Sequence, residues 1–377
     1  MVTGARSEYY ILRPVMSAIR ASRRLRLQTV VTGSHLLPEH GCTVDEIAAD
    51  GFAIDGRVDM VLAGDSLKAM AKSMGVGIIG LADALDSLRP DVVLLLGDRY
   101  EMLSAAVAAA YSGMVVAHIH GGDSPRGGFD EYSRHAITKM GHIHFAATER
   151  SARRIRQMGE DPERVFVVGS PAIDALLRDA PTPRRRLERA YRLPRGEPFI
   201  LVVQHPVSTS PASAAREIGM TLDALAPLGM PMVGVFPNVD PGGERMRKRL
   251  LARASRLDMR LFANVPHEDY LGLMGACAAL VGNSSSGIIE GPTLRVPVVN
   301  IGDRQAGRER AENVIDVRGD KASITRAVLR ATDPAFKGRL SNLKNPYGDG
   351  HASERIVKVL EGIDLGGALL RKRFHDL

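Results

Sequence analysis

DVVLLLGDRYEMLSAAVAAAYSGMVVAHIHGGD, residues 91–123, contains two largely apolar runs on either side of an alanine-rich segment. The runs cover 92–96 and 115–119, and the segment between them, 101–112, has helical character. A strand that is apolar at every position is typical of a parallel sheet, because helices bury both of its faces. The stretch therefore predicts a β-α-β unit and an α/β fold.

The same alternation of apolar runs and amphipathic segments continues on both sides of this unit, with a long helix expected at 66–88. It predicts two doubly wound halves, each built on a parallel sheet. Only three residues precede Gly4, so the first strand is a stub or the native start lies upstream. The other expected strands are 27–32, 58–62, 143–147 and 165–168 in the first half, and 199–203, 232–236, 259–262, 278–281 and 296–301 in the second.

The length of 377 residues favours two domains. Pro181, Pro183, Pro194 and Pro198 surround a charged helical stretch, which is typical of an interdomain connection. The expected boundaries are 1–177 for an N-terminal Rossmann-like domain, 178–197 for the linker and 198–349 for a second Rossmann-like domain.

The composition excludes several classes of protein. No run of about 18 apolar residues could span a bilayer, and no charged-then-apolar leader is visible at the N-terminus. Cys42 and Cys277 show no CxxC or zinc-type spacing, which fits a reducing compartment. We therefore expect a cytoplasmic protein without a membrane partner.

The net charge of +7 raises the question of a nucleic-acid partner. The basic residues are mostly arginines scattered along helices, the chain has no Trp, and it shows no zinc-finger, RNP or basic-zipper pattern. A positive cleft that attracts an anionic small molecule explains the charge equally well. We expect no nucleic-acid partner.

Polar residues that follow strands are candidates for the site, because ligands of open α/β sheets bind beyond the carboxyl ends of the strands. Two such edges that face each other across a cleft would form a binding site. The polar clusters are 4–8, 32–35, 97–99 and 118–135 in the first half, and 204–206, 237–238, 282–287 and 302–304 in the second.

The cluster NSSSG at 283–287 precedes a helical stretch and is a candidate phosphate site. Backbone N–H groups and hydroxyls at a helix N-terminus can hold a phosphate, and Arg304 and Arg308 could neutralise a diphosphate. Glu290 could accept hydrogen bonds from both ribose hydroxyls. The alternatives are a simple serine N-cap and a solvated helix glutamate.

Asp98 directly follows the apolar run 92–96. Burial there would raise the pKa of the Asp98 carboxyl unless Arg99 or a ligand stabilises the charged form. This is typical of a functional carboxylate, although a structural cap is the competing interpretation.

The histidine-rich stretch 118–135 resembles a metal site at first sight. His118 and His120 are two apart on an expected strand, so they should point the same way, and Asp130 is placed to cap the next helix. Zinc needs three or four converging ligands, but HExxH is absent, and Arg134 and Lys139 put positive charge where a cation would sit. An acid/base site is therefore favoured over a metal site.

In order along the chain, TGARSEYYILRP, TGSHLLPEHG, LLLGDRYEML, AHIHGG, FDEYSRHAITKMGHIHFAAT, VVGSPAIDALL, QHP, PNVD, GNSSSGIIE and IGDRQAGRERAENVI resemble the UDP-N-acetylglucosamine 2-epimerases. The similarity is greatest to their UDP-hydrolysing, sialic-acid-type branch. It implies two Rossmann-like domains of the GT-B type, with the nucleotide in the cleft. It also implies a C-terminal helix, about 350–377, that packs back on the first domain, a homodimer or homotetramer, and no cofactor.

The resemblance implies cleavage of UDP-GlcNAc by elimination. A base removes the C2 proton, UDP leaves from C1, and the glycal intermediate adds water to give N-acetylmannosamine. Because the C2 proton is very weakly acidic, a positioned base and a stabilised leaving diphosphate must share the work. General acid/base catalysis alone contributes only about 10²- to 10⁴-fold.

The resemblance also implies roles for individual residues. Asp98 and Asp130 match catalytic acids of the family, and Arg6 and His205 match basic residues near the diphosphate. The candidate catalytic residues are Asp98, His120, Asp130, Glu131 and His205, and the candidate substrate-binding residues are Arg6, His35, Arg99, Asn238, Ser284, Ser285, Ser286, Gly287, Glu290, Arg304 and Arg308.

One departure from the family concerns His120. The family commonly has HIEGGE where this chain has HIHGGD, so His120 replaces the first glutamate and Asp123 the second. Histidine can act as a base or an acid near neutral pH. Our hypothesis is that Asp98, His120 and Asp130 transfer protons, with Glu131 in reserve, while the division of roles and the acyl-amino sugar stay open.

Four other functions remain as alternatives. A non-hydrolysing epimerase would return UDP to C1, and a hydrolysing epimerase could act on a related diamino-trideoxy sugar nucleotide. A GT-B glycosyltransferase would pass the sugar to an acceptor, and a sugar-nucleotide sensor would do no chemistry. The GDR and RHAITK forms favour hydrolysis, and the cluster of acids and histidines argues against a sensor.

Overall fold

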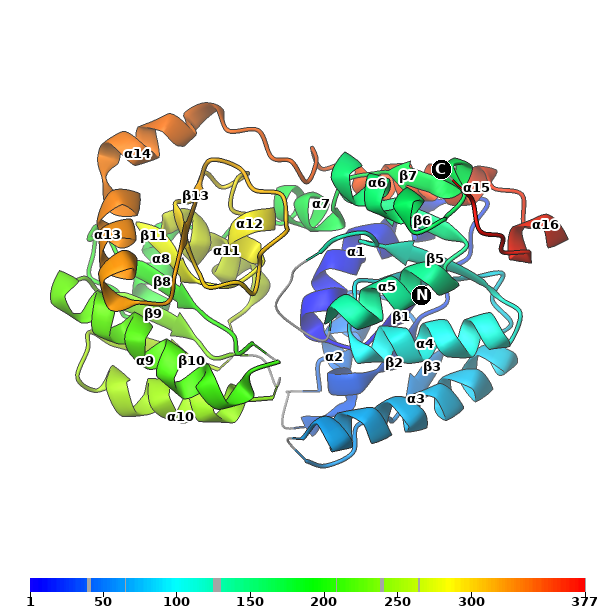
Figure 1. Ribbon diagram of the computed structural model, residues 1–377, viewed down its shortest axis with the longest axis horizontal. Coiled ribbons are helices and arrows are strands. Elements are labelled where there is room, and N and C mark those ends of the chain that lie inside the picture. The colour runs from blue at the N-terminus through cyan, green and yellow to red at the C-terminus, as the bar shows by residue number, and fades with distance from the viewer. Residues whose placement is uncertain are drawn as a thin grey trace. The chain divides into compact units, whose positions relative to one another are not determined.

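The computed structural model describes residues 1–377 except 39–41, 65, 125–129, 208, 238–240, 264 and 377. It contains two compact units (Figure 1). Unit 1 comprises Met1–Ser124, Asp130–Ala175 and Tyr347–Leu377, and unit 2 comprises Leu176–Pro346. All strand pairs among the described residues are parallel, which confirms the predicted α/β class.

Unit 1 contains two neighbouring sets of parallel strands, in the orders β1-β2-β3 and β4-β5-β6-β7, and β1 lies beside β4. The strands are β1 (Val2–Thr3), β2 (Val30–Thr32), β3 (Gly56–Val58), β4 (Val92–Leu96), β5 (Val115–Ile119), β6 (Ile143–Ala146) and β7 (Val165–Val167). The helices are α1 (Arg6–Ala21), α2 (Val44–Ala49), α3 (Leu67–Leu88), α4 (Tyr100–Tyr111), α5 (Asp130–Met140), α6 (Glu149–Gln157), α15 (Ala352–Gly362) and α16 (Gly367–Leu370), with α7 (Pro171–Arg178) at the end of the unit.

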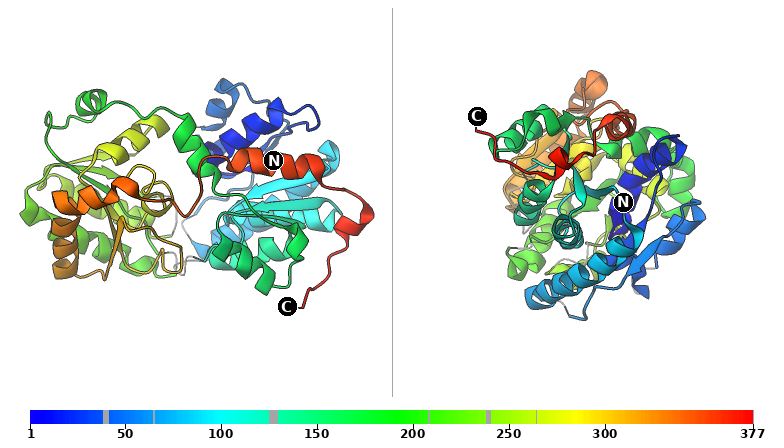
Figure 2. Two further views of the ribbon diagram at one scale, coloured as in Figure 1. Left: turned by 90° about the horizontal axis from the view of Figure 1, so that it is seen from above. Right: turned by 90° about the vertical axis from the view of Figure 1, so that its right-hand side faces the viewer.

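Strand β4 separates two apolar cores in unit 1. Val93 and Leu95 pack with residues of α3 and α4, whereas Leu94 and Leu96 pack with residues of α1 and α15. Alternate side chains of a strand point to opposite faces, so an entirely apolar strand serves both cores. Helix α15 lies against α1, although the two are far apart in sequence (Figure 2).

Unit 2 has one parallel sheet of order β10-β9-β8-β11-β12-β13. Ile200 and Val202 of β8 pack in one core with α9, α10 and α13, and Leu201 and Val203 pack in the other with α8 and α11. Its strands are β8 (Ile200–Val203), β9 (Met232–Val235), β10 (Met259–Phe262), β11 (Ala279–Gly282), β12 (Val298–Ile301) and β13 (Val314–Val317), and its helices are α8 (Arg184–Ala190), α9 (Ala214–Leu225), α10 (Gly243–Ala254), α11 (His267–Ala276), α12 (Ser286–Ile289), α13 (Lys321–Thr332) and α14 (Pro334–Arg339).

The first strand is a stub of two residues, Val2–Thr3, which is one of the two expectations stated for it. Other strands differ from the expectation: β2 covers only Val30–Thr32 of the expected 27–32, and β3 lies at Gly56–Val58 rather than at 58–62. Strand β13 was not predicted. None of the described helices is long and apolar enough to cross a membrane.

Candidate functional site

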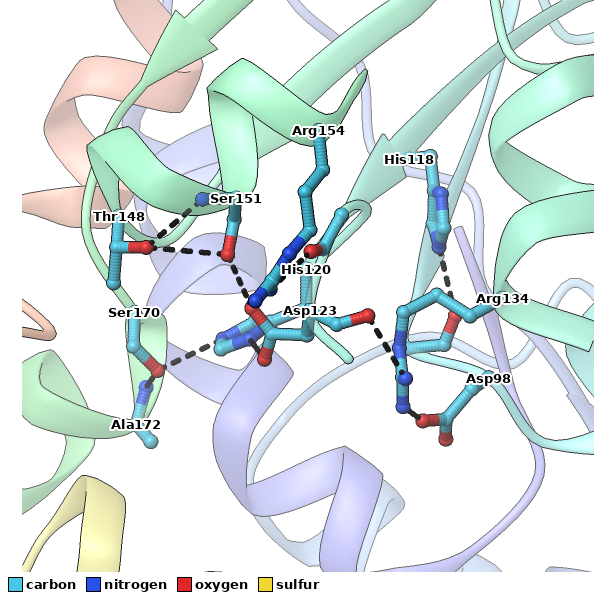
Figure 3. Close-up of polar contacts among 12 residues, drawn as sticks. Asp98, His118, His120, Asp123, Arg134, Thr148, Ser151, Arg154, Ser170 and Ala172 are labelled. Carbon is cyan, nitrogen blue, oxygen red and sulfur yellow. Dashed lines mark hydrogen bonds and ion pairs between the residues drawn. The ribbon is translucent and has the colours of Figure 1, made fainter. Parts of the chain in front are cut away.

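In unit 1, Asp98 lies just beyond the carboxyl end of β4. Gly97 has a φ of 79°, a conformation that glycine adopts easily, and it turns the chain out of the strand. The Asp98 carboxylate forms an ion pair with the guanidinium of Arg134 on α5 (Figure 3). Arg134 is only 1% exposed. A nearby opposite charge favours the ionised form of a carboxylate.

The guanidinium of Arg99, the neighbour of Asp98, pairs with the buried Glu101, with N–O distances of 3.0 and 3.2 Å. Glu101 in turn lies against Gly4, where an added Cβ would be 3.0 Å from the Glu101 side chain. Arg99 therefore connects the start of α4 to the loop after β1.

His120 follows β5 with a φ of 65° and does not continue the strand. Its Nδ1 lies 3.2 Å from Asp123 Oδ2, and its Nε2 lies 2.9 Å from Ser170 Oγ. The expectation that His118 and His120 point the same way is therefore wrong, because the left-handed backbone at His120 breaks the strand alternation. Figure 3 shows the two rings well apart.

His118 has hydrogen-bond partners of its own. Its Nε2 donates to the carbonyl oxygen of Gly97 at 2.7 Å, and its Nδ1 contacts the Thr138 hydroxyl at 3.1 Å. Burial lowers the pKa of His118 to about 3, more than the Gly97 hydrogen bond raises it. His118 is thus a neutral, buried link between β4, β5 and α5.

Helix α5 starts at Asp130, so Asp130 lies in the first turn rather than before it as a cap. Its neighbour Glu131 accepts hydrogen bonds from Ser124 Oγ at 2.8 Å and from His135 Nε2 at 3.1 Å. Burial raises the pKa of Glu131, but these two hydrogen bonds outweigh it, and the net pKa is lowered. The positive end of the helix dipole also favours both anions.

Lys139 lies near the C-terminal end of α5, and not beside His118 and His120 as expected from the sequence. Its ammonium pairs with Glu160 at 2.6 Å, where His144 and Lys372 also bind the same carboxylate. Within the described part of the chain, no group of three or more His, Cys, Asp or Glu side chains could hold a metal ion.

Arg6 is the first residue of α1, and His35 lies in a short 3-10 helix, Gly33–Leu36, that follows β2. Arg6 is held by Glu46, with an Nε–Oε2 distance of 3.1 Å, and stacks on the Tyr10 ring at 5.3 Å. His35 is fully buried between Thr3 and Thr43, at 3.0 and 2.7 Å. Burial, with a smaller effect of Arg99, lowers the pKa of His35 to about 4, so this ring is neutral.

In unit 2, Asn283 organises the loops at the carboxyl edge of the sheet. Its side chain accepts from the His205 N–H at 2.7 Å and donates to the His205 carbonyl at 2.9 Å. Its own carbonyl accepts from Arg304 and Gln305, each at 3.1 Å. Asn283 belongs to the candidate phosphate cluster 283–287, but its role in joining these loops was not predicted.

Ser284 and Ser286 form a small hydroxyl network with Tyr270. The two serine hydroxyls lie 2.8 Å apart, and that of Ser286 is 2.5 Å from the Tyr270 hydroxyl. Ser285 stands at the N-cap of α12 without a side-chain cap bond, so the alternative interpretation as a simple serine cap does not hold for Ser285. Gly287 allows close packing, since an added Cβ would lie 2.9 Å from Val298.

Glu290 follows α12 and has an unusual carboxylate. Its Oε2 is buried and has no hydrogen-bond partner among the residues that the structure describes. Burial raises the pKa of Glu290 to about 7, while Arg308 lowers it. Glu290 therefore offers a buried carboxylate oxygen that can accept hydrogen bonds from a ligand. Asn238, another candidate, lies outside the described residues.

The parallel sheets and the polar loops at their carboxyl ends place the protein in the class of α/β proteins with two Rossmann-like units. A family model described as UDP-N-acetylglucosamine 2-epimerase matches residues 17–361. The chain belongs to the UDP-N-acetylglucosamine 2-epimerase family, and the predicted family resemblance is confirmed.

Relatives match over nearly the whole chain. A UDP-N,N'-diacetylbacillosamine 2-epimerase (hydrolyzing) of Legionella pneumophila is 36% identical over 98% of this chain and 97% of its own. A GDP/UDP-N,N'-diacetylbacillosamine 2-epimerase (hydrolyzing) of Campylobacter jejuni is 35% identical over 100% and 98%. A UDP-N-acetylglucosamine 2-epimerase of Neisseria meningitidis is 29% identical over 100% and 98%.

Solved structures agree with the fold. The crystal structure of a UDP-GlcNAc 2-epimerase from Neisseria meningitidis bound to UDP-GlcNAc has a TM-score of 0.82 at 22% identity, covering 95% of this chain and 98% of its own. This similarity confirms the predicted fold of two Rossmann-like domains of the GT-B type.

Proposed function

We propose that the protein is a hydrolysing 2-epimerase that converts a UDP-linked 2-acetamido sugar into UDP and the free C2 epimer. The observation that carries the proposal is the ion pair between Asp98 and the buried Arg134. It places a carboxylate beside a buried guanidinium at the edge of the sheet, a pairing that favours the charged form, and a base that removes a carbon-bound proton must be unprotonated before the reaction. The hydrolysing relatives from Legionella and Campylobacter support the outcome.

The proposed reaction has two stages. The C2–H bond breaks, its proton passes to a base of unit 1, and the C1–O bond breaks as UDP leaves, which forms a C1=C2 glycal. Water then adds its oxygen to C1, and a proton reaches C2 on the opposite face. Asp98, His120 and Asp130 are the proposed proton-transfer groups, with Glu131 in reserve.

Unit 2 is proposed to hold the UDP part. The Glu290 carboxylate would accept the ribose hydroxyls, since it has a buried oxygen without a partner among the described residues. Ser284, Ser286, Arg304 and Arg308 supply hydroxyl and guanidinium donors for uridine and diphosphate. Stabilising negative charge on the leaving diphosphate lowers the barrier to elimination. The remaining proposed ligands are His205, Asn238, Ser285 and Gly287 in unit 2 and Arg6, His35 and Arg99 in unit 1.

Two sugars are candidates. UDP-N,N'-diacetylbacillosamine is favoured by the relatives that are 36% and 35% identical. UDP-GlcNAc, the first expectation from the sequence, is the second candidate and is supported by the relative that is 29% identical. By family resemblance we also propose that the protein is cytoplasmic and forms a homodimer or homotetramer. Light scattering of the purified protein would test the oligomeric state.

The proposal is tested by incubating the protein in D₂O with each sugar nucleotide, without added metal, and recording proton and phosphorus NMR spectra. Free UDP with a C2-deuterated, C2-epimerised sugar supports hydrolysing epimerisation, and the sugar that reacts faster identifies the substrate. Accumulation of the epimeric UDP-sugar would instead indicate a non-hydrolysing epimerase. Absence of turnover with both sugars would contradict the proposal and favour a glycosyltransferase or a sensor.

A further inference from the structure

We propose that Asp123 and Ser170 are positioning residues that hold the His120 ring in one tautomer, with its proton on Nδ1, and that Ser151 orients Asp123. The inference concerns the same site as the proposed function. It rests on that function for its kinetic measurement only, because the tautomer can be measured directly.

The contacts form a continuous chain of hydrogen bonds (Figure 3). Thr148 Oγ1 donates to Ser151 Oγ at 3.1 Å, and Ser151 Oγ donates to Asp123 Oδ1 at 2.8 Å. Asp123 Oδ2 lies 3.2 Å from His120 Nδ1, and Ser170 Oγ lies 2.9 Å from His120 Nε2. Asp123 and Ser170 are 3% and 1% exposed, so bulk water does not compete for these bonds.

The direction of each bond follows from the donors available. An ionised carboxylate only accepts, so the contact of Asp123 Oδ2 with His120 Nδ1 requires a proton on Nδ1. Since a neutral ring carries only one such proton, Nε2 is then an acceptor, and the Ser170 hydroxyl can donate to it while its oxygen accepts from the backbone N–H of Ala172 at 3.3 Å. In the neutral ring Nδ1 is therefore the donor and Nε2 the acceptor.

The backbone around Asp123 is fixed by two arginines. Arg134 Nη1 donates to the Asp123 carbonyl at 3.2 Å, and Arg154 Nη1 donates to the Gly122 carbonyl at 2.9 Å. At Gly122, where φ is 75°, an added Cβ would lie 2.1 Å from the Ser151 carbonyl oxygen. The loop therefore lies tightly against the start of α6, which also carries Ser151.

The conformation of His120 itself indicates that the ring is placed by its surroundings. A positive φ is strained in a residue other than glycine, and it persists only where neighbouring contacts over-determine it. The hydrogen bonds to Asp123 and Ser170 supply such contacts. They turn the ring away from His118 and fix Nε2 as the nitrogen that can take up a proton.

Ser170, His120 and Asp123 resemble the nucleophilic triad of hydrolases in their order of contacts. The burial of Ser170 and its bond to the Ala172 N–H argue against nucleophilic attack by its hydroxyl. Its contact with His120 is that of an anchor. After Nε2 takes up a proton, the adjacent Asp123 carboxylate stabilises the imidazolium.

The test uses the full chain labelled with ¹⁵N at histidine and long-range ¹H–¹⁵N correlation spectra, with His120 assigned by the His120→Gln variant. The expected spectrum shows a protonated Nδ1 and a pyridine-type Nε2 at a pH where the ring is neutral. In Asp123→Asn the amide can donate to Nδ1, so the tautomer should reverse. The kcat should fall by about 10²-fold or more with KM changed less than about two-fold.

Matched controls separate this effect from general damage. Glu354→Gln makes the same change beside another histidine, His351, at an exposed ion pair of 3.2 Å, and should leave the His120 signals and kcat unchanged. The buried pair of His144 and Glu160 serves as an internal reference whose signals should not move in Asp123→Asn.

Two outcomes overturn the proposal: an unprotonated Nδ1 in the wild-type ring, or an unchanged tautomer in Asp123→Asn. If Asp123→Asn does not fold, Ser151→Ala and Ser170→Ala replace it. Ser151→Ala should keep the tautomer, and Ser170→Ala should keep it while moving the Nε2 shift towards that of a free acceptor. If neither sugar nucleotide reacts, the proposed function is contradicted, but the tautomer result still stands.

Discussion

Glu290 is the residue whose protonation should be coupled most directly to ligand binding. Burial raises the pKa of its carboxyl from 4.5 to about 7, and ribose hydroxyls donate hydrogen bonds best to the charged form. The affinity for uridine, which lacks the titrating phosphates of UDP, should rise as the pH increases through about 7 and then level off. Titration calorimetry between pH 5.5 and 8.5 measures this.

The Glu290→Gln variant should bind uridine more weakly and without this pH dependence. Exposed Glu312→Gln serves as the control and should retain the pH dependence.

The stability of the unliganded protein should change with pH in the opposite direction to uridine affinity. A buried carboxyl with a raised pKa costs stability as the pH rises from 4.5 to 7, so Glu290→Gln should gain stability relative to wild type over that window. Equal slopes in wild type and variant would contradict this assignment.

Asp98→Asn should lower kcat by about 10²- to 10⁴-fold, because the amide cannot take up the C2 proton. It also leaves the buried Arg134 without the charge of Asp98, so some loss of thermal stability is expected. Rates are therefore compared well below the unfolding temperature of the variant. Asp91→Asn, an exposed change at the start of the same strand, should react at the wild-type rate, and a similar loss there would exclude a specific role for Asp98.

Single residues also show what the sequence could not predict. Asp98 and Glu290 could be placed because each follows a recognisable apolar run or helix. The direction of His120 could not, since a positive φ at a residue other than glycine is set by contacts with Asp123 and Ser170 that lie outside the local pattern. Lys139 was misplaced for a related reason, because its partner Glu160 lies 21 positions further along the chain.

At the scale of an element, the end of β11 depends on one glycine. Gly282 has a φ of 145°, and an added Cβ would lie 2.0 Å from the Val203 carbonyl oxygen of β8. Gly282→Ala should therefore destabilise unit 2 by more than about 1 kcal/mol and displace Asn283 from His205. Urea unfolding and uridine binding test both effects.

Gly275→Ala is the matched control for this prediction. Gly275 lies inside α11, and the nearest atom to an added Cβ is in Leu294 at 3.8 Å. Alanine should stabilise that helix by about 0.5–1 kcal/mol, because it restricts the unfolded chain more than glycine does. Destabilisation of the same size at both positions would show that close contact is not the cause.

Elements were predictable in proportion to their burial. Strands β4 and β5 have the predicted bounds, because both faces are buried and every position except His118 is apolar. The edge strand β13 was missed, since Val314–Val317 is short, half-exposed and interrupted by Asp316. An edge strand gains part of its stability from pairing with β12, which a local hydrophobic pattern does not show.

At the scale of the whole molecule, the C-terminal segment is joined to unit 1 by a buried charge cluster. Lys372 pairs with Glu160 at 2.6 Å and also donates to the Gly141 carbonyl. Burial raises the pKa of Glu160, but hydrogen bonds from His144, Lys139 and Lys372 outweigh it and lower the pKa to about 2. Lys372→Met should therefore cost about 1.5–3 kcal/mol near neutral pH.

The pH dependence of this loss has a defined sign. A carboxyl with a depressed pKa stabilises the fold above 4.5, and the contribution disappears as the pH falls towards 2. The stability difference between wild type and Lys372→Met should shrink over that window, as measured by urea unfolding at several pH values. Exposed Lys358→Met on α15 is the control, and a difference that does not vary with pH would contradict a role for Glu160.

The packing of α15 against α1 has a consequence for how the protein is made. Ile356 completes the core that contains Tyr9 and Leu12, yet the ribosome synthesises it after every residue of unit 2. The described part of unit 2, Leu176–Pro346, is continuous in sequence and can fold once it has emerged, whereas the apolar face of α1 stays uncovered until α15 is made. Nascent chains arrested before residue 352 should therefore resist protease in unit 2 first, and they should need chaperones to shield the N-terminal helix in the meantime.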